Sequence, residues 1–237
     1  MQETPQNLEE MRLLSLASVN ANGRALGLLP GDILEAVDGA PFGDGIENLV
    51  RLLDNGTQRT AHLMRFSRGD VVWSVLADTA RLGQWRIINA QRPATDLRPR
   101  PDMRTGYRNW IVLCDRDGFY DAHPVRPTWF GLLAPLHLLQ MRLYGPLAIW
   151  GAVVLCGLPL GVVPMAGLAL LASVYFWLAT PALFRADRAA RGYMMCRVMA
   201  ARSEADLHRR VARTDPHLRF VLARRQRIEE PLPSTVE

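Results

Sequence analysis

The feature that most constrains this chain is an apolar block, Leu143 to Phe184, that contains no charged side chain. One crossing of a bilayer takes about 20 apolar residues, and the block is about twice that long. The run Pro159-Leu160-Gly161-Val162-Val163-Pro164 interrupts it near its middle. A soluble hairpin, the alternative, could hardly bury apolar surface on every side of both helices in so small a protein. The block therefore predicts an α-helical membrane hairpin, with transmembrane helices at about 143–158 and 165–184.

A second apolar segment lies just before this block. Thr128 to Gln140 is apolar, contains Pro135 and His137, and is too short to cross a bilayer. We expect a preceding interfacial or re-entrant helix at residues 128–141, with a third span as the alternative. The membrane region is thus expected to cover residues 128–184.

The distribution of basic residues predicts an orientation for this region. Every basic residue is arginine, and arginines flank the apolar block on both sides while its central turn has none. By the positive-inside rule both termini are expected in the cytosol, and the acidic opening MQETPQNLEE lacks the pattern of a secretory signal. Residues 185–237 are expected to form a basic cytosolic tail. Because anionic headgroups attract each nearby arginine by about 1 kcal/mol, we expect membrane-surface contacts from Arg142, Arg185, Arg188, Arg191 and Arg197.

Residues 1–90 have the pattern of a small α+β domain. Short apolar runs at 12–19 and 33–37 predict strands, and the runs at 57–66 and 71–77 predict a hairpin around Ser67-Arg68-Gly69-Asp70. Leu29-Pro30-Gly31-Asp32 and Asp38-Gly39 are typical of tight turns. A helix is expected after Asp44, because Ile46, Leu49, Val50 and Leu53 form a helical stripe that ends at Asn55-Gly56.

The two turns at this spacing, Leu-Pro-Gly-Asp and Val-Asp-Gly, followed by a helix and a hairpin, resemble the PDZ family as it occurs in bacterial proteins. The resemblance covers roughly residues 12–79 and implies that a partner's extended segment adds as a strand beside the first strand, against the helix. It implies a peptide-binding groove formed by Leu13, Leu14, Ser15, Leu16, Ala17, Ile46, Leu49, Val50 and Leu53. The place of the family's Gly-rich carboxylate-binding loop is taken by Asn7-Leu8-Glu9-Glu10-Met11. An internal peptide or a neighbouring domain is therefore as suitable an occupant as a free C-terminus.

The middle of the chain joins these two regions. Residues 91–107 are rich in proline and arginine and predict a semi-extended linker. Residues 108–127 predict a short β-hairpin around Asp115-Arg116-Asp117-Gly118. From about residue 107 to 211 the chain also resembles a bacterial membrane family known only as a domain of unknown function. The shared features are Arg116-Asp117-Gly118-Phe119, Trp129-Phe130, the apolar hairpin and Arg191-Gly192-Tyr193. This resemblance implies the bacterial inner (cytoplasmic) membrane.

The sequence offers no pattern that assigns a catalytic group, a metal ligand or a cofactor. Asp115, Asp117 and Asp121 lack the glycine and glutamate positions of an EF-hand. The histidines stand apart, and there is no Gly-x-Ser-x-Gly or His-Glu-x-x-His pattern. The three cysteines are widely scattered, which predicts free thiols in a reducing compartment. No nucleic-acid-binding motif accompanies the positive charge.

These observations favour a non-catalytic, membrane-anchored PDZ-like adaptor that holds a peptide segment or protein partner at the cytosolic face of the inner membrane. Two alternatives remain open. One is a small accessory or assembly subunit of a larger membrane protein complex, and the other is a non-catalytic modulator of a membrane protease.

Overall fold

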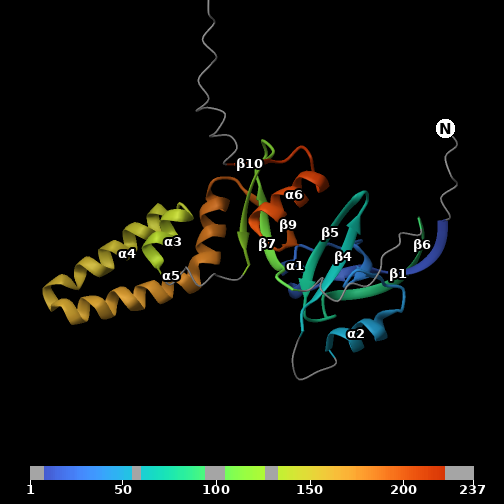
Figure 1. Cartoon of the computed structure of the whole chain (residues 1–237), viewed down its shortest axis with the longest axis horizontal. Helices are drawn as coiled ribbons and strands as arrows, with labels where there is room; N and C mark the ends of the chain where they lie inside the picture. The colour runs from blue at the N-terminus through green and yellow to red at the C-terminus, as the bar shows by residue number, and fades with distance from the viewer. Residues whose placement is uncertain (1–7, 55–59, 94–104, 126–132, 222–237) are drawn as a thin grey trace, which may run out of the picture. The chain divides into compact units, whose positions relative to one another are not determined.

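The computed structural model describes residues 8–54, 60–93, 105–125 and 133–221, which form an α+β fold with antiparallel sheets (Figure 1). The chain divides into two compact units. The first unit combines residues 1–110 with residues 196–220, and the second unit comprises residues 111–195 and 221–237. The first unit is therefore assembled from two separate stretches of the sequence.

The first unit is built on a six-stranded antiparallel sheet with the order β5-β4-β2-β1-β6, in which β3 pairs with β2. Its strands are β1 (Leu8–Val19), β2 (Ile33–Val37), β3 (Ala40–Pro41), β4 (His62–Arg68), β5 (Val71–Ala77) and β6 (Gly83–Pro93). Strands β1 and β6 pair along their whole length, with a bulge between Leu16 and Ser18. The predicted hairpin between β4 and β5 is confirmed in regular register.

Two short helices complete the N-terminal part of this unit. Helix α1 (Ala21–Ala25) begins after Asn20, whose side chain accepts hydrogen bonds from the Asn22 and Gly23 amides and caps the helix. Helix α2 (Ile46–Asp54) is confirmed. The core includes Phe66, whose ring stacks with Trp73 and with Trp85, and the ring centroids are 6.3 Å apart in each pair.

The two glycine turns identified in the sequence have positive φ angles, which glycine adopts readily. Gly31 has φ 95°, and Asp38 and Gly39 have φ 50° and 84°. Two consecutive positive φ values between antiparallel strands are typical of a type I′ turn, for which Asp-Gly is a favoured pair. The Asp38-Gly39 turn therefore brings β3 directly beside β2.

A second sheet has four strands in the order β10-β8-β7-β9. These strands are β7 (Arg108–Cys114), β8 (Phe119–Pro124), β9 (Met194–Ala201) and β10 (Arg219–Phe220). The expected hairpin at 108–127 corresponds to β7 and β8. Helix α6 (Glu204–Thr214) follows β9, and its N-cap Ser203 accepts a hydrogen bond from the Asp206 amide.

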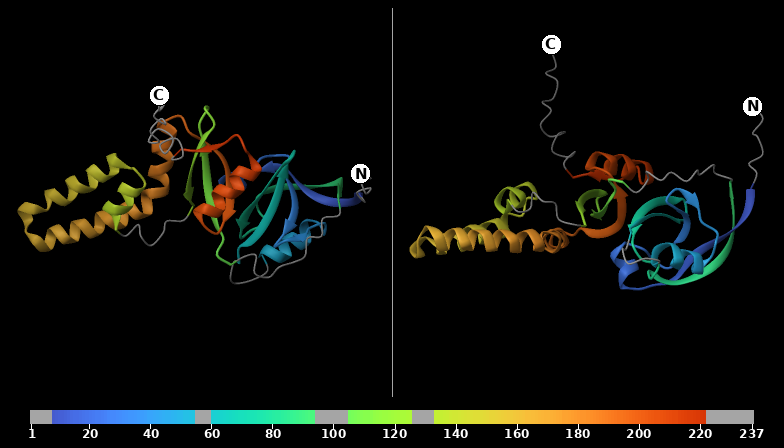
Figure 2. Two further views of the ribbon diagram at one scale, coloured as in Figure 1. Left: turned by 45° about the horizontal axis from the view of Figure 1, so that its top comes forward. Right: turned by 60° about the horizontal axis from the view of Figure 1, so that its bottom comes forward.

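The second apolar segment forms α3 (Ala134–Gln140), and the apolar block forms α4 (Tyr144–Cys156), the 3-10 turn η3 (Leu158–Leu160) and most of α5 (Val162–Ala190), all in the second unit. Helices α4 and α5 lie side by side in the left view of Figure 2, and the Trp150 indole on α4 donates a hydrogen bond to Ser173 on α5. A small core of Ala134, Leu138, Leu143 and Phe176 joins α3 to this pair.

Helix α5 is long and apolar enough to cross a membrane, by length and composition, and only 6% of its most apolar stretch is buried inside the structure. Val163 and Leu171 are 84% and 69% exposed. The helix continues past the predicted end at residue 184 and includes Arg185 and Arg188. Helix α4 is shorter than a crossing requires. The described part of the chain therefore contains one helix with the dimensions of a membrane span.

The predicted basic tail at 185–237 is wrong as a single surface segment. Residues 196–220 belong to the first unit and include most of β9 and all of α6. Leu207 and Val211 on α6 are 0% and 2% exposed, so the apolar face of this arginine-rich helix packs into a protein core. The predicted linker at 91–107 begins within β6, and residues 94–104 lie outside the described part of the chain.

Candidate functional site

The predicted groove strand has no free edge where a partner was expected to bind. Leu13, Leu14, Ser15 and Leu16 are at most 2% exposed. Strand β6 pairs along one edge of β1, and β2 pairs with Leu14 and Ser15 on the other edge. Leu16 exchanges backbone hydrogen bonds with Gly31 and Asp32, and Ala17 lies in the bulge. The prediction that a partner strand adds beside residues 13–17 is therefore wrong, because segments of the chain itself occupy both edges of β1 there.

The helix side of the predicted groove is mostly core. Leu49 and Leu53 are 0% and 3% exposed, Ile46 is half-buried, and Val50 is 42% exposed. The helical stripe thus packs α2 onto the sheet, and Val50 is the member of it that faces solvent. Leu52, which lies outside the predicted stripe, is 43% exposed.

In the part of the chain that the structure describes, β6 is an edge strand to which a partner strand can add, and the sequence reasoning missed it. Strand β6 stands at one end of the sheet order and, among the described strands, pairs with β1 alone. Its Ile87 is 59% exposed. Beside it lies a shallow cleft of about 120 Å³, lined by Ile87, by Arg12, Leu13 and Leu14 of β1, and by Gly43, Asp44 and Gly45 ahead of α2. The alternating apolar residues Trp85 and Ile87 were the signal that could have revealed this strand.

The aspartates of the Leu-Pro-Gly-Asp and Val-Asp-Gly turns stabilise the fold through hydrogen bonds. Asp32 is 0% exposed, accepts hydrogen bonds from Arg68 Nε and Nη2 at 2.6 and 2.8 Å, and also accepts one from the Leu29 amide. Asp38 lies 2.7 Å from His62 Nδ1 and accepts a hydrogen bond from the Leu63 amide. Both carboxylates thereby tie a turn to β4.

A larger cleft of about 470 Å³, called here the arginine cleft, lies in the first unit between the sheet and the segment β9–α6. Arg65 and Trp73 line it from β4 and β5, and Arg210 and Arg213 line it from α6. Tyr107 and Asp70 also contribute to its wall. Sequence reasoning could not find this cleft, because the residues of its two walls, such as Arg65 and Arg210, are 145 positions apart.

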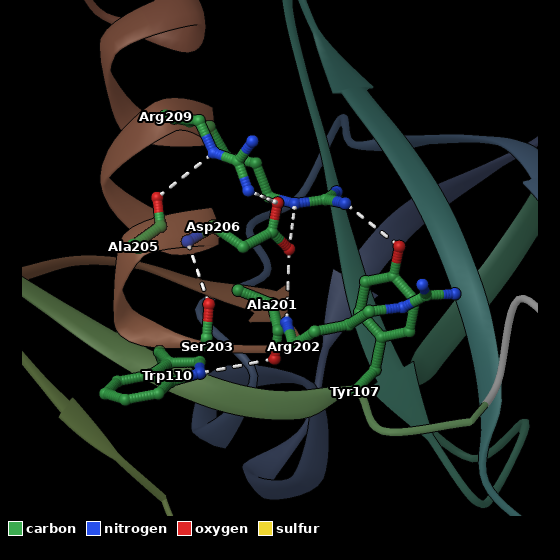
Figure 3. A network of polar contacts seen from close by, with 9 residues as sticks. Tyr107, Trp110, Ala201, Arg202, Ser203, Ala205, Asp206 and Arg209 are labelled. Atoms are coloured by element: carbon green, nitrogen blue, oxygen red, sulfur yellow. Dashed lines mark hydrogen bonds and ion pairs between the residues drawn. The ribbon is translucent and has the colours of Figure 1, made fainter.

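Hydrogen bonds hold one wall of the arginine cleft in place (Figure 3). Arg210 donates to Asp206 at 3.0 Å and to the Tyr107 hydroxyl at 2.9 Å. Although burial favours the neutral carboxyl, hydrogen bonds from the Arg202 amide and from Arg210 lower the pKa of Asp206. The Arg210 guanidinium is therefore fixed before any ligand arrives, with several of its five N–H donors unused.

The second unit contains a buried ion pair that joins β8 to α5. Arg188 donates to Asp121 at 2.7 Å and to Asp187 at 2.6 Å, and Arg188 and Asp121 are 7% and 8% exposed. The Arg188 guanidinium lies 4.7 Å from the centroid of Phe184, whose ring also contacts His123 with centroids 4.8 Å apart. Arg188 is thus part of the interior of the second unit.

Two of the five arginines predicted to contact the membrane surface are therefore corrected. Arg188 is buried in its ion pair, and Arg197 belongs to the first unit, where its guanidinium lies 5.9 Å from the centroid of Trp73. Burial lowers the pKa of Arg197. Arg185 and Arg191 are exposed and Arg142 is half-buried, so their predicted contacts with lipid stay a prediction.

Among the residues that the structure describes, no group of three or more His, Cys, Asp or Glu side chains is arranged to hold a metal ion. Cys114 and Cys196 are disulfide-bonded and Cys156 is free and exposed, so the expectation of free thiols is wrong for two of the three cysteines. Comparison of the chain with protein-family models, with curated proteins and with solved structures gives no match.

His123 should make the stability of the second unit depend on pH. It is 2% exposed, and burial, assisted by nearby His137 and Arg185, lowers its pKa from 6.5 to about 4 although Asp121 opposes the shift. Between these two values the unfolded chain binds a proton that the folded chain excludes, so the free energy of unfolding falls as the pH falls from about 6.5 to about 4, by roughly 1 kcal/mol per pH unit. The check is the thermal unfolding midpoint in detergent at several pH values.

In that experiment His123→Phe should remove most of the slope between pH 6.5 and 4. His217→Phe is the control, because His217 is exposed, and it should leave the slope unchanged. An equal slope in the His123→Phe variant and the unmodified chain would show that other groups carry the pH dependence.

Proposed function

We propose that this chain is a non-catalytic, membrane-anchored adaptor, in which the apolar helices hold the first unit at the membrane and the first unit binds an extended segment of a protein partner. The observation that carries the proposal is the exposure of α5, a helix with the length and composition of a membrane span and few buried residues along its most apolar stretch. Such a surface is stable in lipid and costly in water.

The free edge of β6 supports the binding part of this proposal. An extended peptide can add to an exposed sheet edge through main-chain hydrogen bonds, and side-chain contacts then supply specificity. The exposed Ile87 on β6 and the adjoining cleft offer those contacts. Attachment to a membrane raises the effective concentration of a partner on the same surface to about millimolar for short flexible links, so a weak contact suffices.

The PDZ-like assignment of the first unit also remains a proposal. It is supported by the Leu-Pro-Gly-Asp and Val-Asp-Gly turns and by the positions of α2 and the β4–β5 hairpin after them. In this form of the proposal β6, rather than β1, receives the partner strand, because the chain itself fills both edges of β1 around residues 14–16.

The side of the membrane needs a direct test, since two observations point in opposite directions. The exposed Arg185 and Arg191 at the end of α5 favour the cytosol. The disulfide-bonded Cys114 and Cys196 are typical of an oxidising compartment. We propose the cytosolic inner face, and reporter fusions at each terminus should be active on the cytosolic side. Activity of either reporter in the periplasm would overturn this orientation.

Photo-crosslinking tests the proposed binding edge. A photoreactive residue at Ile87 should crosslink discrete protein partners in intact cells, whereas one at the exposed Arg24 on α1 should not. Ile87→Asp should reduce recovery of those partners several-fold after gentle detergent extraction, because it places a charge on the apolar contact. Several substoichiometric partners support an adaptor, and one stoichiometric partner would replace it with an accessory subunit.

A further inference from the structure

The arginine cleft described above lies apart from the β6 edge and has no role in the proposed function. We propose that it binds a small organic anion carrying two or more carboxylate or phosphate groups. Its volume of about 470 Å³ lies within the range of small-molecule sites, about 300–1,000 Å³. The proposal does not depend on membrane anchoring or on peptide binding at β6.

The charges that line the cleft favour an anion. Among its described lining residues three are arginines, Arg65, Arg210 and Arg213, and one, Asp70, is acidic. Arg65 on β4 and the two arginines on α6 stand on opposite walls, so cations approach a ligand from two sides. Arginine guanidinium groups match carboxylate and phosphate oxygens with paired N–H donors.

Existing ion pairs leave this donor capacity largely intact. Arg65 has a contact with Glu35 at 3.5 Å, and Arg210 uses its Nε and Nη2 for Asp206 and Tyr107. Each guanidinium has five N–H donors, so both arginines can bind further acceptors. Arg213 is exposed and lies three residues after Arg210, which places the two cations on one face of α6.

Trp73 and Tyr107, which line the same cleft, each carry an uncharged hydrogen-bond donor. The Trp73 indole N–H is buried without a hydrogen-bond partner in the described part of the chain, and Trp73 lines the cleft. The Tyr107 hydroxyl accepts from Arg210, which leaves its own proton to donate. An unpaired buried donor is costly, and because less than 1 Å² of the indole nitrogen is exposed, an acceptor reaches it only if the side chains that cover it shift.

The preorganisation of Tyr107 and Arg210 is also what a binding site requires. The Tyr107 ring is contacted by Arg202 and by Arg210, whose guanidinium carbons lie 4.9 and 5.2 Å from the ring centroid. These contacts and the Asp206 hydrogen bond restrict the rotamers of Arg210. Less conformational entropy is then lost when a ligand binds.

The test uses the full chain in detergent, with citrate and inorganic pyrophosphate as probes at matched ionic strength. Titration calorimetry should show saturable binding of at least one probe, and the preferred probe tells carboxylate from phosphate chemistry. Arg213→Glu should weaken that binding about tenfold, because it replaces an attraction with a repulsion. Arg24→Glu is the control: it makes the same charge change at an exposed position of the first unit, outside the lining, and should change the affinity less than about twofold.

Trp73→Phe provides an independent variant, because it keeps an aromatic ring and removes only the indole N–H, and it should weaken binding several-fold. Absence of saturable binding by either probe would overturn the proposal, as would equal losses in Arg213→Glu and Arg24→Glu. If a glutamate-rich peptide or anionic vesicles bind in an Arg213-dependent way and the two small probes do not, the cleft is a macromolecular contact and the small-molecule proposal is wrong.

Discussion

Asp121→Ala should lower the free energy of unfolding of the second unit by about 3 kcal/mol, because it leaves the Arg188 guanidinium buried without its main carboxylate. The two side chains are joined by a 2.7 Å hydrogen bond and are almost completely buried. Asp187 still contacts Arg188 after the substitution, so the loss should fall at the lower end of the range for broken buried pairs. Denaturant unfolding in detergent, followed by circular dichroism, measures the change.

Two further variants separate a lost ion pair from a general disturbance. Arg191→Ala removes an exposed partner of Asp187 at 3.0 Å and should cost less than about 1 kcal/mol. Combining Asp121→Ala with Arg188→Leu should recover part of the loss, since it removes the uncompensated charge. If Asp121→Ala is as stable as the unmodified chain, the pair is not the anchor of α5 that its burial indicates.

Leu171→Arg should release the chain from the membrane fraction or lead to its degradation. Leu171 is 69% exposed on the apolar stretch of α5, and an arginine near the centre of a membrane helix costs about 3 kcal/mol of insertion free energy. This cost corresponds to about a hundredfold in the insertion equilibrium. Fractionation of cells after alkaline extraction measures the membrane-bound share.

The matched control is Leu52→Arg, which introduces the same side chain at an exposed apolar position of the first unit. It should leave the membrane-bound share unchanged. A soluble, folded chain in both variants and in the unmodified protein would show that α4 and α5 are covered by protein rather than lipid, and the anchoring proposal would then be withdrawn.

Local patterns predicted the elements whose signals lie within a few residues. The Asp38-Gly39 turn, helix α2 and the β4–β5 hairpin depend on backbone angles and side chains close in sequence. The helices of the uncharged block could also be predicted, because composition alone defines this block. These elements form much of the first unit and all of the apolar helices.

The candidate sites were harder to predict because they depend on pairing between distant segments. Strand β6 fills one edge of β1 as far as Leu8↔Pro93, and no local pattern shows which strand will take that edge. The Arg210–Tyr107 hydrogen bond joins residues 103 positions apart, and the Arg188–Asp121 pair joins residues 67 apart. The local sequence, in which arginines follow an apolar block, suggests that they contact lipid. The ion pair with Asp121 shows that Arg188 does not.

The split composition of the first unit affects how the protein is made. Its core needs Leu207 and Val211, which emerge from the ribosome only after every residue of α4 and α5 has been synthesised. During translation the N-terminal part must therefore wait, incomplete, while the apolar helices reach their final environment. An N-terminal fragment that ends at residue 110 would lack residues 196–220 of the first unit, so truncation before the membrane region is a poor route to a soluble protein.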